Sequence, residues 1–122
     1  MSLVVLVRHA HSQANAAGIL SGRRPNIALS EKGRTQAQEL AMRLGELKVK
    51  ELRVSPLQRC IETIDPWVST KSRIRRIEDH GITEVDYGKW SGRTLRSLSR
   101  EKLWKIVQEN PSRVFFPDGE GM

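Results

Sequence analysis

Residues 3–12, LVVLVRHAHS, place a run of apolar residues directly before a cluster of basic side chains. The β-branched run over residues 3–7 predicts a strand buried on both faces, as the strands of parallel sheets are. Arg8 and His9 follow at the carboxyl end of that strand, and open α/β sheets bind their ligands at this edge. We therefore expect the chemistry of the protein to lie beside Arg8 and His9.

Helix and strand patterns alternate after this segment. Ser30 has the residue type of an N-cap, and apolar residues at helical spacing continue the predicted helix as far as Leu47. A short strand is predicted over residues 52–54. Ser55 then predicts the N-cap of a second helix, with Pro56 at its first position.

The remaining residues extend the same alternation. Pro66 is expected to kink or end the second helix, and residues 72–77 predict a further strand. Residues 79–93 are typical of a loop, and Thr94 is expected to cap a helix that runs to about Gln108. This order predicts an α/β fold, a layered α/β/α architecture with a mostly parallel central sheet.

Composition excludes several classes of protein. The chain has 122 residues, of which 38% are hydrophobic and 29% charged, as expected for one small folded domain. No apolar run approaches the length of a membrane span, and residues 3–7 are too short for a signal peptide. We therefore expect a cytoplasmic protein with no membrane partner. The single cysteine, Cys60, cannot form an internal disulfide.

The formal net charge of +7 leaves two kinds of partner to consider, a nucleic acid or a small anionic substrate. No helix-turn-helix, zinc-ligand spacing or aromatic-basic RNA motif is present. The sequence therefore predicts no nucleic-acid partner and favours a phosphate-binding pocket, to which part of the positive charge would belong.

Three separate segments could supply phosphate chemistry. Arginine binds a phosphate group through two parallel hydrogen bonds, and the neutral histidine of the Arg8-His9 pair can attack phosphorus. Arg59 lies one turn into the second helix and can return to the same sheet edge. The carboxylates in residues 84–92 could act as a general acid if one of them stayed protonated.

Two other kinds of site are not supported. His9 and His11 have no carboxylate within residues 8–15 to complete a ligand set, so we expect no metal site. Cys60 is followed by neither the glycine nor the arginine that a thiol phosphatase needs, and helical phase places it beside Ile61 and Ile64. Cys60 is therefore predicted to be a buried structural residue.

Six short motifs follow one another over nearly the whole chain. In chain order they span Arg8–Asn15, Ser21–Gly22, Leu29–Ala37, Ser55–Thr63, Ile82–Gly92 and Pro117–Glu120. In this order they resemble the motifs of the histidine phosphatase superfamily, also called the phosphoglycerate mutase-like family. Any one of them is a weak signal, whereas the ordered set is a specific one.

The resemblance implies roles for individual residues. It implies that His9 is the phosphorylated nucleophile and that Glu84 is the proton donor. Arg8 and Arg59 would clamp the phosphate group with help from Asn15.

The resemblance also implies where the substrate lies. Ser21, Gly22 and Tyr87 fall at positions that contact substrate in relatives, and neither a cofactor nor a metal ion is implied. Two positions depart from the family pattern, because Ala10 replaces a glycine and His11 replaces a glutamate or glutamine. The change at His11 removes a carboxylate from the pocket rim and should alter substrate preference.

The implied activity is metal-independent phosphoryl transfer through a phosphohistidine. Phosphomonoester hydrolysis is the leading form of this activity. A phosphoglycerate-type mutase is an alternative, and so is a catalytically incompetent fragment or pseudoenzyme that only binds phosphorylated ligands. These remain open because the second pocket histidine of the family falls after the last matched motif. His80-Gly81 resembles its segment but precedes Glu84.

The absence of the second pocket histidine also bears on domain organisation. We expect residues 1–122 to be the N-terminal portion of a single histidine phosphatase domain, without its C-terminal strand and helices. In relatives that strand lies between those matching residues 3–7 and 52–54, so a gap is expected there. Oligomeric state is left open.

Overall fold

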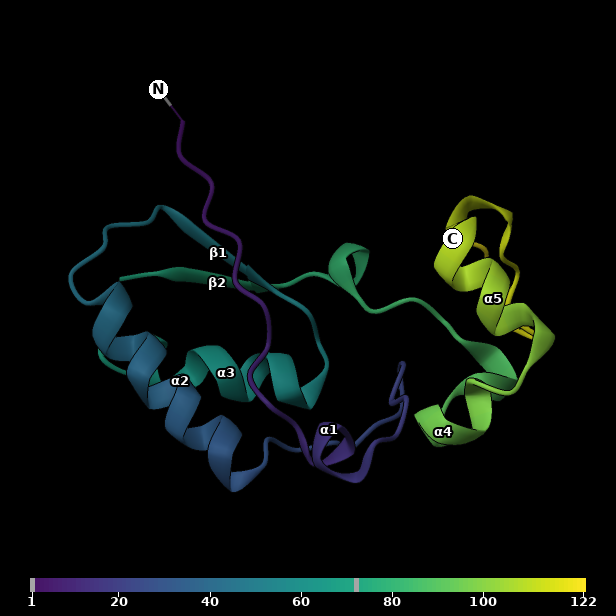
Figure 1. The fold of residues 1–122 in the computed structure, drawn as a ribbon. Coiled ribbons are helices and arrows are strands. Elements are labelled where there is room, and N and C mark those ends of the chain that lie inside the picture. The colour runs from purple at the N-terminus through teal and green to yellow at the C-terminus, as the bar shows by residue number, and fades with distance from the viewer. Residues whose placement is uncertain (1, 72) are drawn as a thin grey trace.

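Two parallel strands and two helices packed against them form the larger part of the protein (Figure 1). This computed structural model describes residues 2–71 and 73–122. Strand β1 (Glu51–Val54) pairs in parallel with β2 (Arg75–Glu78), so that the first residues of the two strands are partners. The predicted α/β class with a parallel sheet is confirmed. Residue 72, where the second of these strands was predicted to begin, lies outside the described residues.

Helix α2 (Glu31–Leu44) begins where the sequence predicts. Ser30 is its N-cap, and the Ser30 hydroxyl accepts a hydrogen bond from the backbone N–H of Gly33. A serine in this position satisfies one of the unpaired N–H groups in the first turn, which explains the accuracy of the local signal.

Helix α3 (Gln58–Val68) differs from the prediction at both ends. Residues 56–57 form a bend before the helix starts, and its N-cap is Leu57, whose aliphatic side chain has no oxygen to accept a capping hydrogen bond. Pro66 does not end the helix, which continues to Val68. Because proline has no backbone N–H, the helix lacks only the hydrogen bond that residue 66 would donate to the carbonyl oxygen of residue 62.

A hydrophobic core lies between β1 and the helices α2 and α3. Val54, Ile64 and Trp67 are its buried members, and apolar residues of α2 pack around them. The indole N–H of Trp67 donates a 3.0 Å hydrogen bond to the carbonyl oxygen of Gly45, at the C-cap of α2. This contact closes the core at the end of α2 farthest from His9.

A second hydrophobic cluster forms in the C-terminal third of the chain. Its buried members are Trp90, Leu98, Val114 and Phe116. The helix predicted from Thr94 is divided there into α4 (Leu95–Leu98) and α5 (Lys102–Glu109). Thr94 does cap α4, but the chain turns after Leu98, and this turn lets α5 fold back over the cluster.

Short helical turns connect these elements. They are α1 (Gln13–Ala17) and the 3-10 helices η1 (His80–Ile82), η2 (Gly88–Trp90) and η3 (Pro111–Arg113). In the described part of the chain, no helix is long and apolar enough to cross a membrane.

The prediction for residues 3–7 is wrong. The segment is extended but joins no strand, and its apolar side chains are exposed, Leu6 by 91%. A strand needs partners for its backbone groups, and the residues described here place no strand beside this one. A cavity of about 470 Å³ lies between residues 5–9 and β1.

Gly33 lies in the first turn of α2. Its replacement by alanine should destabilise the protein, although alanine has the higher helix propensity. Alanine normally stabilises a helix interior by about 1 kcal/mol relative to glycine. A Cβ atom at Gly33 would lie 1.9 Å from the carbonyl oxygen of His11, so the backbone would have to move. We expect Gly33→Ala to lower the free energy of unfolding by roughly 1–3 kcal/mol in chemical denaturation.

The exposed Gln38 on the same helix provides the control. Gln38→Ala should change the unfolding free energy by less than about 0.5 kcal/mol. A Gly33→Ala protein as stable as the parent would contradict the close approach of these two segments.

Candidate active site

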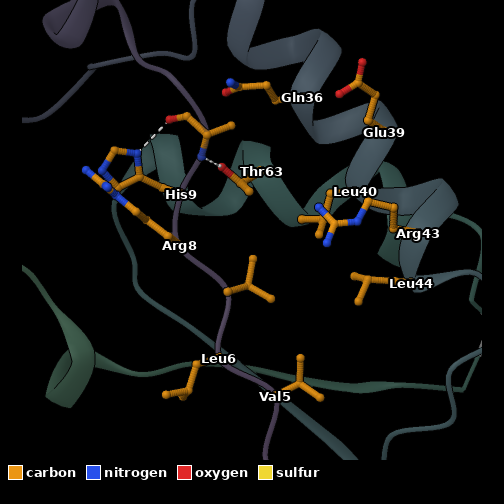
Figure 2. Close-up of a pocket in the computed structure, with 12 residues that line it drawn as sticks. Val5, Leu6, Arg8, His9, Gln36, Glu39, Leu40, Arg43, Leu44 and Thr63 are labelled. Atoms are coloured by element: carbon orange, nitrogen blue, oxygen red, sulfur yellow. Dashed lines mark hydrogen bonds between the residues drawn. The ribbon is translucent and has the colours of Figure 1, made fainter.

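His9 lies at the end of the extended N-terminal segment, where the chain turns toward α1. Its Nδ1 atom is 2.7 Å from the carbonyl oxygen of Ala10 (Figure 2). A carbonyl oxygen only accepts, so Nδ1 must carry the proton in this contact. The neutral ring then keeps its lone pair on Nε2. The local geometry therefore leaves Nε2 available as a nucleophile.

The backbone beside His9 is tied to helix α3 through Thr63. The Thr63 hydroxyl accepts a 2.9 Å hydrogen bond from the N–H of Ala10 and donates a 2.6 Å bond to the carbonyl oxygen of Arg59. Thr63 is only 3% exposed, so water does not compete for these bonds. One buried hydroxyl thus connects the His9 turn to the helix that carries Arg59.

Arg59 itself is almost completely buried, with 2% of its surface exposed. Its Nη2 atom donates a 2.9 Å hydrogen bond to the carbonyl oxygen of Gly22. The buried Nε atom has no hydrogen-bond partner among the described residues. A buried guanidinium with an unused donor is costly unless an anion binds it, so this position suits a phosphate group.

Glu84 reaches the same place from the loop after β2. Its Oε2 atom is 4.0 Å from Nη2 of Arg59. Its Oε1 atom accepts hydrogen bonds from the Tyr87 hydroxyl at 3.2 Å and from the backbone N–H of Val85 at 2.9 Å. These contacts hold the carboxylate beside the buried guanidinium while 36% of the side chain stays exposed.

Two cavities border these residues, one on each side of the N-terminal segment. The cavity of about 470 Å³ is lined by Arg8, His9, Arg59 and Glu84 together. A second cavity, of about 580 Å³, is bounded by α2 and also by Arg8 and His9. Figure 2 shows Arg8 and His9 side by side at one end of this second cavity. The structure thus brings four of the predicted site residues together.

Gly22 and Tyr87 lie directly behind that group. Gly22 has a positive φ of 53°, and a Cβ atom there would lie 3.1 Å from Cδ2 of Tyr87 and 2.7 Å from Oγ of Ser91. Glycine allows both the left-handed turn and this close approach. The loop that contains Gly22 therefore packs against the aromatic ring that supports Glu84.

Asn15 and Ser21 are bound to neighbouring parts of the chain and, like Gly22 and Tyr87, they do not line either cavity. The Asn15 Oδ1 atom accepts hydrogen bonds from the backbone N–H of Ser12 at 2.9 Å and from its hydroxyl at 3.0 Å. This capping box fixes the start of α1, and the amide nitrogen of Asn15 holds the donors that a phosphate would use. The backbone carbonyl of Ser21 accepts from the N–H of Arg24. Neither Asn15 nor Ser21 is among the residues that line the two cavities.

The side chain of His11 points to the start of α2. Its Nδ1 atom lies 2.7 Å from the hydroxyl oxygen of Ser30, and its backbone N–H donates to the side chain of Gln36 at 2.9 Å. The residue is therefore occupied in joining the loop to α2. The expected effect of His11 on substrate preference stays a prediction.

The structure adds two functional candidates: Arg23, and Thr63, which the sequence marks only as the last residue of the Ser55–Thr63 motif. The spacing of Thr63, four residues after Arg59, places both side chains on one helical face and could have indicated the link. Arg23 contacts the backbone of Glu84 and the side chain of Glu120, which is 97 residues away. No local pattern reports a contact over such a separation.

The chemistry of the remaining candidates is limited. No group of three or more potential metal ligands is found within residues 2–71 and 73–122. Burial raises the pKa of the Cys60 thiol, although a hydrogen bond with Ser55 and the charge of Arg59 oppose the shift. A thiol with a raised pKa stays protonated near neutral pH and is a poor nucleophile.

Comparison with known proteins identifies the family of the chain. The model of the "Histidine phosphatase superfamily (branch 1)" matches residues 4–122. Phosphoserine phosphatase 1 of Hydrogenobacter thermophilus is 33% identical over 125 residues, which cover 100% of this chain and 58% of the relative. A 2,3-bisphosphoglycerate-dependent phosphoglycerate mutase of Thermoplasma acidophilum is 32% identical over 99 residues, covering 81% of this chain and 49% of the relative.

A solved structure has the same fold over the matched part of the chain. The alpha-ribazole phosphatase from Shigella flexneri superposes with a TM-score of 0.78 at 27% sequence identity, covering 94% of this chain and 57% of that one. The chain thus spans about half the length of the proteins it resembles.

Tyr87 provides a spectroscopic test of the site. Burial of the phenol raises its pKa from 10.0 to about 12, and the nearby carboxylate of Glu84 adds to the shift. Tyr87 is the only tyrosine of the chain, so phenolate absorbance reports it alone. We expect the absorbance to rise with a midpoint near pH 12 in the folded protein and near pH 10 in denaturant.

The same shift makes stability depend on pH. Because the folded-state pKa lies above the unfolded value, the contribution is complete below pH 10 and is lost as the pH rises toward 12. Tyr87→Phe should remove this part of the pH dependence while leaving that of the lysines. Phenolate formation near pH 10 in the folded protein would show that the hydroxyl is not held at Glu84.

Proposed function

This chain belongs to the histidine phosphatase superfamily, and we propose that the whole protein hydrolyses phosphomonoesters through a phosphohistidine at His9. The observation that carries the proposal is the contact between Nδ1 of His9 and the carbonyl oxygen of Ala10, which uses Nδ1 as the donor and leaves Nε2 as the ring nitrogen that can attack phosphorus. The shared cavity that Arg8, Arg59 and His9 line is the second support.

In the first step, Nε2 of His9 attacks phosphorus in line with the ester oxygen. The N–P bond forms as the P–O bond breaks, and the carboxylic acid of Glu84 gives its proton to the leaving oxygen. Arg8 and Arg59 offset the charge on the transferring phosphoryl group. Glu84 lines the same cavity as His9 and Arg59, and this shared lining supports the assignment.

In the second step, water attacks the phosphohistidine. The carboxylate of Glu84 accepts a proton from that water as the new P–O bond forms. The P–N bond breaks and its electron pair returns to Nε2 of His9. Inorganic phosphate leaves, and the enzyme is again in its starting state without any metal or cofactor in the cycle.

The substrate class is a small phosphate ester. The relatives include a phosphatase named for phosphoserine and a phosphoglycerate mutase. The same phosphohistidine can pass its group to a second hydroxyl instead of to water, which is the mutase alternative.

The decisive variant is His9→Ala, made in the protein expressed from its complete reading frame. Removal of the nucleophile should lower turnover of a phosphate monoester by at least about 10³-fold. Acid quenching of the parent protein during turnover should trap an acid-labile phosphohistidine that is absent from the variant. His80→Asn is the matched control, because this exposed histidine of η1 lies outside the proposed machinery.

Product analysis separates the alternatives. Release of inorganic phosphate in step with the alcohol identifies a phosphatase, whereas transfer to a second hydroxyl without release identifies a mutase. A His9→Ala protein that keeps the activity of the parent would exclude His9 as the nucleophile. An intact protein that binds phosphate esters but never labels His9 would be a binding protein instead.

A further inference from the structure

We propose that Arg23 and Glu120 form a positioning pair that holds Glu84 at the phosphate site. This inference rests on the proposed function, since it takes Glu84 as the proton donor. Neither residue touches the reacting atoms. They act by fixing the loop that carries Glu84.

Arg23 makes the central contacts. Its Nε atom donates a hydrogen bond to the backbone carbonyl oxygen of Glu84. Its Nη2 atom donates to both carboxylate oxygens of Glu120, at 3.0 and 3.1 Å. The Oε2 atom of Glu120 also accepts a 3.1 Å bond from the backbone N–H of Asp86. The ion pair of Arg23 and Glu120 therefore binds the loop on both sides of Val85.

The loop that holds Glu120 is itself bound closely to the loop of Glu84. The backbone N–H of Glu120 donates to the carbonyl oxygen of Asp86 at 2.8 Å, and the N–H of Lys89 donates to that of Pro117 at 2.8 Å. A Cβ atom on Gly119 would lie 2.3 Å from the Asp86 oxygen. The two loops are therefore bound tightly to each other, and Arg23 binds both of them.

The other end of the connection is the phosphate site. The residue before Arg23 is Gly22, whose carbonyl oxygen accepts the hydrogen bond from the buried Arg59. Adjacent residues of one short loop thus hold the proposed phosphate ligand and the proposed proton donor. The distance of 4.0 Å between Arg59 and the Glu84 carboxylate depends on this loop.

The exposure of the pair separates positioning from global stability. The side chains of Arg23 and Glu120 are 41% and 49% exposed. An ion pair this exposed contributes little to folding stability. Loss of the pair should therefore leave the thermal midpoint almost unchanged while moving the Glu84 carboxylate.

A comparison of two substrates reports proton donation specifically. An alkyl phosphate such as glycerol phosphate has a poor leaving group and needs the acid, whereas p-nitrophenyl phosphate has a good one and needs it little. In the protein from the complete reading frame, Arg23→Met and Glu120→Gln should each lower kcat for glycerol phosphate by roughly 10–100-fold. The same variants should change kcat for p-nitrophenyl phosphate by less than about threefold.

Arg24 supplies the matched control. It is also an exposed arginine of this loop, and its guanidinium lies near Gly92. Arg24→Met should leave the ratio of the two kcat values at that of the parent protein. The double variant Arg23→Met with Glu120→Gln should be no worse than the more impaired single variant, because the two residues act as one pair.

Each other outcome overturns the proposal. An equal fall for both substrates would show a general structural role, and unchanged kcat values would show that the pair has no role in catalysis. Multiplying effects in the double variant would show that the residues act separately. A parent protein that turns over neither ester would instead contradict the proposed function, and the positioning role with it.

Discussion

The hydroxyl group of Thr63 is the point on which the candidate site depends. It accepts from the backbone beside His9 and donates to the carbonyl of Arg59, so one buried side chain sets the spacing of the proposed nucleophile and the proposed phosphate ligand. The N-terminal segment has no strand partner in the described part of the chain, and the contacts of His11 with Ser30 and Gln36 fix the chain just beyond Ala10. The nucleophile is thus held mainly from its carboxyl side, through Ala10.

The loop of residues 18–24 extends this arrangement to the rest of the molecule. The backbone N–H of Leu20 donates to the carbonyl of Arg93 at 3.0 Å, and the N–H of Gly92 donates to that of Leu20 at 2.7 Å. The Leu20 side chain packs on the C-terminal hydrophobic cluster. That cluster is therefore the support for a loop whose next residues hold Arg59 and the Glu84 backbone. Packing in the C-terminal cluster therefore helps to fix the position of Glu84, the proposed proton donor.

Local sequence signals predicted where helices begin. Burial and contacts between distant segments could not be predicted in the same way. Ser30 was identified as an N-cap because capping involves only the next few residues. The apolar run over residues 3–7 indicates burial, but whether it is buried depends on partners that its own pattern does not specify. The motifs gathered Arg8, His9, Arg59 and Glu84 into one site. The motif that ends at Glu120 did not indicate its ion pair with Arg23, because the two residues are 97 positions apart.

The rate of His9 phosphorylation in Thr63→Val, measured by rapid quench against Thr63→Ser, tests the central claim most directly. Valine keeps the shape but leaves the buried Ala10 N–H without an acceptor, at a cost of about 1–3 kcal/mol, while serine keeps both hydrogen bonds. In the protein from the complete reading frame, below its unfolding transition, we expect Thr63→Val to form phosphohistidine at least about tenfold more slowly, since 1.4 kcal/mol corresponds to a factor of ten. Thr63→Ser should stay near the parent rate. Parent-like phosphorylation in the folded Thr63→Val protein would contradict the account.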